Sequence, residues 1–451
     1  MKLIYGVKDK PKFGQVLVFA FQQLLAILAA TIAVPAIVGN GMSQSAALFG
    51  AGVGTIVYLL FTKFRSPVFL GSSFAFLGSM FAAFAGAVSA EAGYVGIILG
   101  AVFAGLVYVV LALIVKFAGV KWIDKLMPAA VIGPTVAIIG LSLAGNAVGD
   151  VLKFAEYDAV NSVYEMGAKG WIGLICGLVT LVAVILSSVY GKKMAKMIPF
   201  IIGILAGYVV AAIFTVIGIA TENETLKIID FSLFQNMQWL PEFTFWKAKD
   251  GLSAITGSYI GTIAVAYVPV AFVVFAEHIA DHANLSTIID QDLLKDPGLH
   301  RTLLGDGVGS MAGAFFGGCP NTTYGESVGC VAITGNASVR TIIATAIVAI
   351  VASFFAPFIT FLATIPSCVM GGVCITLYGF IAVSGLKMIQ KVNLGENKNL
   401  FTVAVILITG IGGMSLKIGK VTLTEIAVAL ILGIIVNLLL KNGKSEDAPK
   451  Q

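Results

Sequence analysis

The chain has 451 residues, of which 58% are hydrophobic and only 11% are charged. Soluble globular proteins carry about 25% charged residues, so this composition excludes a protein that faces water on all sides and predicts a membrane protein. The formal net charge is +5 at pH 7, but the basic residues are dispersed between apolar segments and do not indicate binding to nucleic acid.

Fourteen apolar segments are expected when the hydrophobic runs are compared with the roughly 20 residues that an α-helix needs to cross a bilayer. Seven precede the polar stretch 221–250 and seven follow it. The predicted fold class is an all-α polytopic membrane protein with about fourteen transmembrane segments. In chain order these segments are 14–38, 44–61, 67–85, 93–115, 127–148, 170–190, 197–220, 253–289, 303–318, 321–335, 339–363, 366–389, 399–415 and 421–440.

The basic residues predict the orientation of these segments. With the N-terminus in the cytoplasm, 21 of the 28 Lys and Arg residues fall on the cytoplasmic side and 7 fall outside. This bias satisfies the positive-inside rule, although the loop with Lys417 and Lys420 runs against it. An even number of spans then places both termini in the cytoplasm, as expected for a multi-pass protein of the cell (inner) membrane.

Two segments are interrupted, and they occupy corresponding places in the two halves. Seven is an odd number, so the second half must enter the membrane with the opposite polarity, which predicts two inverted seven-helix repeats. The third segment begins within Ser-Pro-Val-Phe-Leu-Gly-Ser-Ser-Phe (66–74), and the tenth begins within Gly-Cys-Pro-Asn-Thr-Thr-Tyr-Gly-Glu (318–326). Pro and Gly are poor helix formers, so we expect short extended strands in segments 3 and 10, followed by half-helices. Irregular backbone at this depth persists only where protein or a water-filled cavity satisfies it.

Acidic residues inside these apolar stretches are the main functional candidates. Glu277 lies about 20 Å from the end of its helix, at 1.5 Å per residue, and Glu326 lies in the broken tenth segment. A carboxylate at membrane depth costs at least about 2.5–3.5 kcal/mol and therefore marks a substrate or ion site. Asp281 follows Glu277 on the same helical face, and His278 and His282 form a pair on the adjacent face. This pattern predicts a proton relay or, alternatively, a buried structural hydrogen-bond cluster at a helix crossing.

Residues at the helix breaks are the predicted ligands of a small polar molecule. Half-helix N-termini would offer backbone N–H groups near Phe74 and Tyr324, and the Phe74 ring could stack on a planar ligand. Ser73 would add a hydroxyl group, unless it satisfies the broken backbone instead. The predicted substrate-binding residues are Glu277, Glu326, Phe74, Tyr324, Ser73 and Gly325, and the predicted proton-coupling residues are Asp281, Glu277 and His278.

Neither a metal site nor a cofactor is predicted. The five cysteines lie in apolar segments without metal-ligand spacing and are expected to be small buried hydrophobic residues. His278 and His282 have a spacing that zinc could use, but the region shows no further ligands. The expected partners are a small-molecule substrate, a coupling ion and the lipid bilayer.

Five sequence blocks resemble the nucleobase–ascorbate transporter (nucleobase:cation symporter-2) family, most closely its bacterial uracil permeases. The tenth-segment block Pro-Asn-Thr-Thr-Tyr-Gly-Glu is specific, and the resemblance covers most of the chain. The blocks are 70–76, 276–282, 292–301, 320–326 and 369–373.

This resemblance implies a two-domain transporter. The core domain would comprise 1–120 (spans 1–4) and 250–364 (spans 8–11). The gate domain would comprise 121–249 (spans 5–7) and 365–451 (spans 12–14, with a cytoplasmic tail). The resemblance further implies that a nucleobase is bound by the acids Glu277 and Glu326 and by the backbone amides near Phe74 and Tyr324. It also allows a homodimer formed through the gate domain.

The chain departs from the family pattern at two positions. Asp281 stands where uracil permeases often have histidine and where purine and ascorbate branches carry an acid. Ser327 stands where the family signature has asparagine. The predicted function is proton-coupled uptake of uracil by alternating access, with sodium as the alternative coupling ion. The alternative functions are a purine (xanthine or urate) permease and an anion transporter of similar architecture. An enzyme is not expected, because no Ser-His-Asp set is evident.

Overall fold

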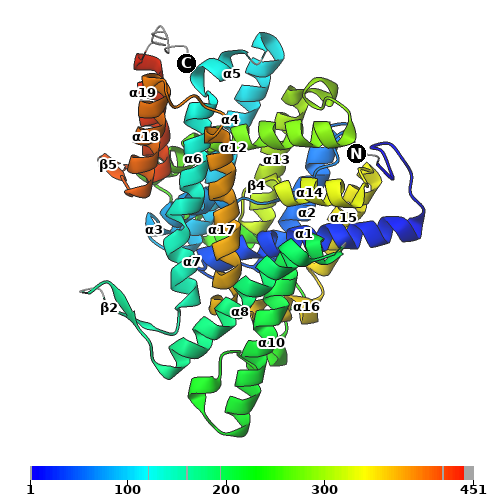
Figure 1. Ribbon diagram of the computed structural model, residues 1–451, viewed down its shortest axis with the longest axis vertical. Coiled ribbons are helices and arrows are strands. Elements are labelled where there is room, and N and C mark those ends of the chain that lie inside the picture. Colours follow the sequence, from blue (N-terminus) through cyan, green and yellow to red (C-terminus); the bar gives the residue numbers. More distant parts are fainter. Residues whose placement is uncertain (1–2, 120, 159–160, 193, 419–420, 441–451) are drawn as a thin grey trace, which may run out of the picture.

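The computed structural model describes residues 3–119, 121–158, 161–192, 194–418 and 421–440, and most of them are helical (Figure 1). In the first half the elements are α1 (Phe13–Val38), α2 (Gln44–Phe61), β1 (Leu70–Ser72), η1 (Phe74–Phe76), α3 (Leu77–Ala85), α4 (Ala90–Ala118), α5 (Lys121–Leu126), α6 (Ala129–Ser142), α7 (Ala144–Val151), β2 (Glu156–Asp158), β3 (Val163–Glu165), α8 (Ala168–Tyr190), α9 (Met194–Met197) and α10 (Pro199–Ala220).

After α10, two short turns, η2 (Glu224–Leu226) and η3 (Phe231–Asn236), lead into the second half of the chain. Its elements are α11 (Thr244–Ala248), η4 (Lys249–Ala254), α12 (Gly257–Ile289), η5 (Leu294–Gly298), α13 (Leu299–Gly317), β4 (Asn321–Thr323), α14 (Gly325–Thr334), α15 (Val339–Ala352), α16 (Ala356–Ala363), α17 (Ser367–Ile389), α18 (Asn397–Ile411), β5 (Leu416–Ile418), β6 (Val421–Leu423) and α19 (Glu425–Leu439).

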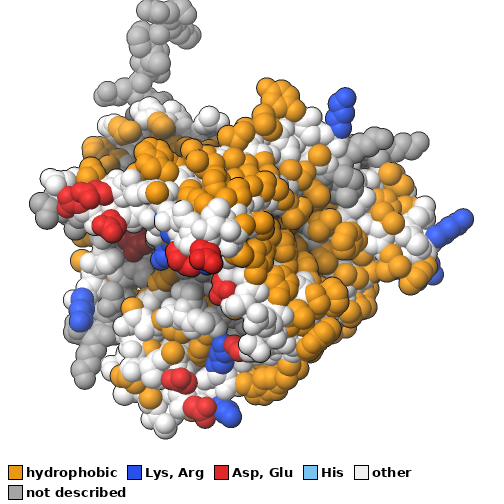
Figure 2. Space-filling view, turned by 90° about the horizontal axis from the view of Figure 1, so that it is seen from below, with side chains coloured by type: hydrophobic (Ala, Val, Ile, Leu, Met, Phe, Trp, Pro, Cys, Tyr) orange, Lys and Arg blue, Asp and Glu red, His pale blue; other side chains and the backbone are white. Residues whose placement is uncertain are grey.

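Eight described helices, with α6 and α7 counted as one, are long and apolar enough to cross a bilayer. The pair α15 and α16 makes a ninth candidate, although the two helices are bent by 81° relative to each other. Figure 2 shows apolar side chains over a broad, continuous part of the surface, with the acidic side chains and some of the basic ones over another part. The protein is therefore a mostly helical, multi-pass membrane protein, as its composition predicts. The count of fourteen spans stays a prediction.

Several elements differ from the expected segments. The expected segment 127–148 is two helices, α6 and α7, and 339–363 is bent because Pro357 lies in the first turn of α16, where proline starts a helix but cannot continue one. The expected start of the last span at 421 is a strand, since β5 and β6 form a hairpin before α19 begins. A second hairpin, β2 with β3, was also not predicted.

Helices from the two halves of the chain pack against one another. Helix α13 packs on α2 and α4, whereas α17 packs on α6 and α8; Figure 1 shows α6 and α17 side by side. Small residues permit the closest of these contacts, as is typical of helices in membranes. A Cβ atom added at Gly54 of α2 would lie 2.7 Å from the carbonyl oxygen of Gly309 of α13. The backbones of α2 and α13 therefore meet almost directly.

Candidate functional site

The two interrupted segments meet as a short antiparallel ribbon inside the protein. Leu70, Gly71 and Ser72 of β1 pair with Thr323, Thr322 and Asn321 of β4, and all six residues are buried. The strands predicted in segments 3 and 10 are thus present, and each pairs with the other across roughly 250 residues of sequence. This pairing satisfies backbone groups that would otherwise be exposed at membrane depth.

Side chains from the breaks reinforce the ribbon. The Tyr324 hydroxyl donates to the carbonyl oxygen of Ser72 at 2.7 Å, and the backbone N–H of Ser73 donates to the carbonyl of Pro320 at 2.9 Å. The Tyr324 ring lies directly over Gly71, since a Cβ atom there would be 2.3 Å from ring carbons. Glycine at position 71 is therefore required for the ring to reach Ser72.

Each strand leads straight into a short helix. Strand β1 is followed by η1, for which Ser73 is the N-cap residue, and β4 is followed by α14, for which Tyr324 is the N-cap residue. The first N–H groups of a helix have no partner within the helix and carry a partial positive charge. Both helix starts line the same cavity, because Ser73, Phe74, Tyr324 and Gly325 all belong to its wall.

This cavity has a volume of about 430 Å³, within the range of about 300–1,000 Å³ that is usual for small-molecule sites. Its wall combines residues from α12 and the two breaks with residues from α6, α9, α10 and α17. Seven of the residues predicted from sequence contribute to it, namely Ser73, Phe74, Glu277, Asp281, Tyr324, Gly325 and Glu326.

Three carboxylates dominate the polar part of the wall. Glu277 and Asp281 come from α12 and Glu326 from the first turn of α14, and all three are partly exposed to the cavity. No ion pair joins them to another described residue. The Thr323 hydroxyl donates to Asp281 Oδ2 at 2.9 Å. The Ser73 hydroxyl is buried and has no hydrogen-bond partner among the described residues, so it is free to bind a ligand.

Aromatic rings form the apolar part of the wall. The Phe74 ring packs edge-to-face on Tyr378, with centroids 5.9 Å apart, and Phe200 and Phe380 line the cavity as well. A flat ligand could pack on these rings while its polar edges meet the carboxylates and the helix N-termini.

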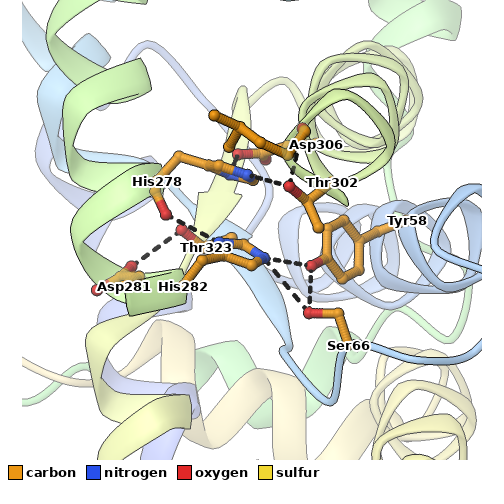
Figure 3. A network of polar contacts seen from close by, with 9 residues as sticks. Tyr58, Ser66, His278, Asp281, His282, Thr302, Asp306 and Thr323 are labelled. Carbon is orange, nitrogen blue, oxygen red and sulfur yellow. Dashed lines mark hydrogen bonds and ion pairs between the residues drawn. The ribbon is translucent and has the colours of Figure 1, made fainter. Parts of the chain in front are cut away.

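His278 and His282 lie on the adjacent face of α12 and do not line this cavity (Figure 3). Both rings are fully buried. His278 contacts Asp306 Oδ2 through Nδ1 at 2.7 Å and Thr302 Oγ1 through Nε2 at 2.9 Å. His282 donates through Nδ1 to the backbone carbonyl of His278 at 2.8 Å, and its Nε2 lies 2.7 Å from the Tyr58 hydroxyl.

These contacts anchor α12 to its neighbours. Asp306 and Thr302 belong to α13, whereas Tyr58 belongs to α2. By holding one face of α12, they fix its rotation so that the face with Glu277 and Asp281 points into the cavity. The arrangement has the form of the buried hydrogen-bond cluster that the sequence left open as an alternative for the histidines. Among the described residues, neither ring forms a hydrogen bond or ion pair with Asp281 or Glu277.

Some residues of the site were not found from the sequence. Lys196 of α9 is the only basic side chain among the described residues that line the cavity, and the sequence indicated it only as part of a cytoplasmic loop. Ser327 does not line the cavity; its hydroxyl accepts hydrogen bonds from Gln23 and from the backbone N–H of Phe69 at 3.0 Å. The departure from the family pattern at Ser327 therefore acts on the packing of β1 and α1 rather than directly on a ligand.

The chain that forms this site is similar to known permeases over nearly its whole length. Residues 14–419 match a family described as a permease family. The chain is 37% identical to a uracil permease of Bacillus caldolyticus, with 97% of this chain and 95% of the relative covered. It is also 37% identical to a uracil permease of Bacillus subtilis (99% and 97% covered) and 34% identical to one of Escherichia coli K12 (97% and 94% covered).

Two solved structures share the fold at low sequence identity. The murine Solute Carrier 26 family member A9 anion transporter in the inward-facing state has a TM-score of 0.66 at 11% identity, with 96% of this chain and 69% of that chain covered. The transmembrane domain of a cyanobacterium bicarbonate transporter has a TM-score of 0.60 at 16% identity, with 96% and 98% covered. At such identities the likeness concerns the fold alone.

Proposed function

The chain belongs to the permease family and is a multi-pass membrane transporter rather than an enzyme, and from that premise we propose that it carries uracil into the cell by proton-coupled alternating access. The observation that carries this proposal is the cavity at the β1–β4 ribbon, whose wall joins three carboxylates, two helix N-termini and several aromatic rings. Relatives named uracil permeases, aligned over nearly the whole chain, support uracil as the substrate.

The polar groups of the wall match those of uracil. The base is planar and presents two N–H donors and two carbonyl acceptors. Glu277 and Glu326 would accept from the N–H groups, while the backbone N–H groups at Phe74 and Tyr324–Gly325 would donate to the carbonyls. Ser73 would add a donor, and the Phe74 ring would stack on the base. A buried polar group left unpaired costs about 1–3 kcal/mol, so this wall would discriminate against analogues that lack a partner.

Proton coupling would reside on Asp281 and Glu277. Several bare carboxylates in one apolar cavity are costly, so at least one must be protonated when the cavity is empty or closed. Asp281 holds a single described hydrogen bond, from Thr323, and can exchange its proton with the cavity. His278 would contribute indirectly, because its contact with Asp306 holds α12 and hence Glu277 in place.

The architecture we propose is two inverted repeats of seven spans. The core domain would comprise 1–120 and 250–364, and the gate domain 121–249 and 365–451, with both termini in the cytoplasm. The cavity is lined from both proposed domains, and its wall includes Lys196 and Met388. The positive-inside orientation puts those residues near the cytoplasm, so this cavity would be the inward-open one. The apolar outer surface of the gate domain would allow a homodimer.

Uptake of radiolabelled uracil into proteoliposomes tests the proposal, with and without an inward proton gradient and with unlabelled uracil, xanthine or hypoxanthine as competitors. Gradient-driven uptake that only uracil blocks is the expected result. Competition by purines would instead identify a purine permease, which the acid at Asp281 favours as the second candidate. Uptake driven by sodium but not by protons would contradict the coupling ion. The three acids on the wall argue against an anion as the substrate.

A further inference from the structure

A second, much smaller cavity lies behind strand β4. It has a volume of about 10 Å³. Its polar wall consists of Tyr108 of α4, Asp306 and Ser310 of α13, and Asn321 and Thr322 of β4, and each of these residues is at most 6% exposed. Thr322 of β4 lines both this cavity and the large one, so the two cavities are neighbours.

Two buried polar atoms in this wall have no hydrogen-bond partner among the described residues. They are Oδ1 of Asp306 and the hydroxyl oxygen of Tyr108. Their side chains are 1% and 4% exposed, respectively, so bulk water does not reach them. Buried polar groups are almost always paired, and an apparent exception indicates an unseen water molecule or ion. The cavity volume of about 10 Å³ is consistent with one bound water molecule, which needs roughly 10–15 Å³ of accessible space.

The hydrogen bonds around Asp306 distinguish a neutral occupant from a cation. The Thr302 hydroxyl donates to the backbone carbonyl of Leu299 at 3.0 Å, so it must accept from His278 Nε2–H at 2.9 Å. One further proton then lies in the 2.7 Å contact between His278 Nδ1 and Asp306 Oδ2. Wherever that proton resides, on nitrogen or on oxygen, the His278–Asp306 pair has a net charge of zero.

We propose that this cavity is a binding site for a single water molecule, which donates to Asp306 Oδ1 and accepts from the Tyr108 hydroxyl. Asp306 Oδ1 is an acceptor in either protonation state of the pair, so the water always has a group to donate to. Its second hydrogen faces the remaining polar wall of Ser310, Asn321 and Thr322. A sodium ion would lack the unbalanced negative charge that holds a cation in an apolar interior.

This water would link α4, α13 and β4 at the back of the large cavity. Through Asp306 it also supports the His278 contact that fixes α12. The water site is independent of which solute the large cavity carries, since none of the atoms that bind the water is proposed to bind the solute.

The test is an experimental structure of the full-length protein at a resolution that resolves ordered water. We expect one density peak within hydrogen-bond distance of both Asp306 Oδ1 and the Tyr108 hydroxyl in the unmodified protein, and its loss in Tyr108→Phe. Tyr267→Phe is the matched control, because Tyr267 also has a buried hydroxyl without a described partner but does not line this cavity; the peak should persist there. An empty cavity in the unmodified protein, or a peak that survives Tyr108→Phe in place, would overturn the proposal.

A second measurement separates water from a cation even if Tyr108→Phe does not fold. The thermal unfolding of the unmodified protein and of Asp306→Asn is followed in sodium chloride and in choline chloride at equal ionic strength. We expect the same midpoint in both salts for each protein. A sodium-specific rise in the midpoint that disappears in Asp306→Asn would identify a sodium site and refute the bound water.

Discussion

The hydroxyl of Thr323 provides a direct test of the role proposed for Asp281. In Thr323→Val the side chain keeps its shape but loses the hydroxyl that donates to Asp281 Oδ2 at 2.9 Å. This donor stabilises the ionised form of Asp281 over the protonated form, because only the ionised form accepts at both oxygens. Without it, Asp281 should hold its proton up to a higher pH.

The size of this effect follows from the hydrogen bond. A hydrogen bond to a charged group contributes about 1.5–3 kcal/mol, and one pH unit corresponds to about 1.36 kcal/mol. Asp281 is partly exposed to the cavity, so water replaces part of the lost interaction and the lower end of the range applies. We therefore expect the midpoint of the pH dependence of uptake to move to higher pH by about one unit.

The assay is initial-rate uptake of labelled uracil into proteoliposomes over a series of external pH values at a fixed proton gradient. Thr323→Ser is the matched control, since it retains the hydroxyl and should retain the original midpoint. A Thr323→Val profile that coincides with that of the unmodified protein would refute the role of this contact. Uptake without any pH dependence in the unmodified protein would refute proton coupling itself, so the two failures can be told apart.

Three further substitutions test the site and the packing that supports it. Glu326→Gln should weaken uracil binding by roughly ten-fold to a hundred-fold, as expected for loss of a charged hydrogen-bond acceptor worth about 1.5–3 kcal/mol. Equilibrium binding of labelled uracil measures this loss. The control is Glu91→Gln, on the exposed first turn of α4, which should bind uracil normally. Gly54→Ala should lower the free energy of unfolding by about 1–3 kcal/mol, because its Cβ would lie 2.7 Å from the Gly309 carbonyl. Gly78→Ala serves as the control in the same thermal melt, because a Cβ atom added at Gly78 would meet no atom within 4 Å. Equal melting midpoints for the two variants would contradict the close contact at Gly54. Tyr324→Phe removes the 2.7 Å hydrogen bond to Ser72 and should cost about 0.5–1.5 kcal/mol of stability; an unchanged melt would show that the ribbon does not depend on it.

Two local properties of the sequence singled out the residues that line the candidate site. Glu277 and Glu326 stand out because a carboxylate is costly in an apolar segment. The Pro/Gly-rich stretches that contain Phe74 and Tyr324 stand out because they cannot continue a helix. The i,i+4 spacing also placed Asp281 beside Glu277, since one helical turn brings such residues to the same face. All of these residues line one cavity in the structure.

The partners of these residues could not be predicted, because they come from elements far apart in the chain. Helical periodicity separates the face with Glu277 and Asp281 from the face with His278 and His282, but it does not say which face meets a cavity and which meets another helix. The choice depends on Asp306 and Thr302, which lie on α13, and on Tyr58, which lies on α2.

The amino-acid sequence by itself determined that the protein spans a membrane and where its helices break, and it singled out Glu277, Asp281 and Glu326 as acids within apolar segments, because these features follow from the local cost of exposing polar groups to lipid. It did not single out the buried Asp306 of α13. Only the tertiary structure decided that β1 pairs with β4, that Lys196 and Phe380 complete the wall, and that Ser327 supports the strand from behind. Those contacts join segments that are distant in sequence, and each forms because burial leaves a backbone or side-chain polar group that must find a partner within the protein.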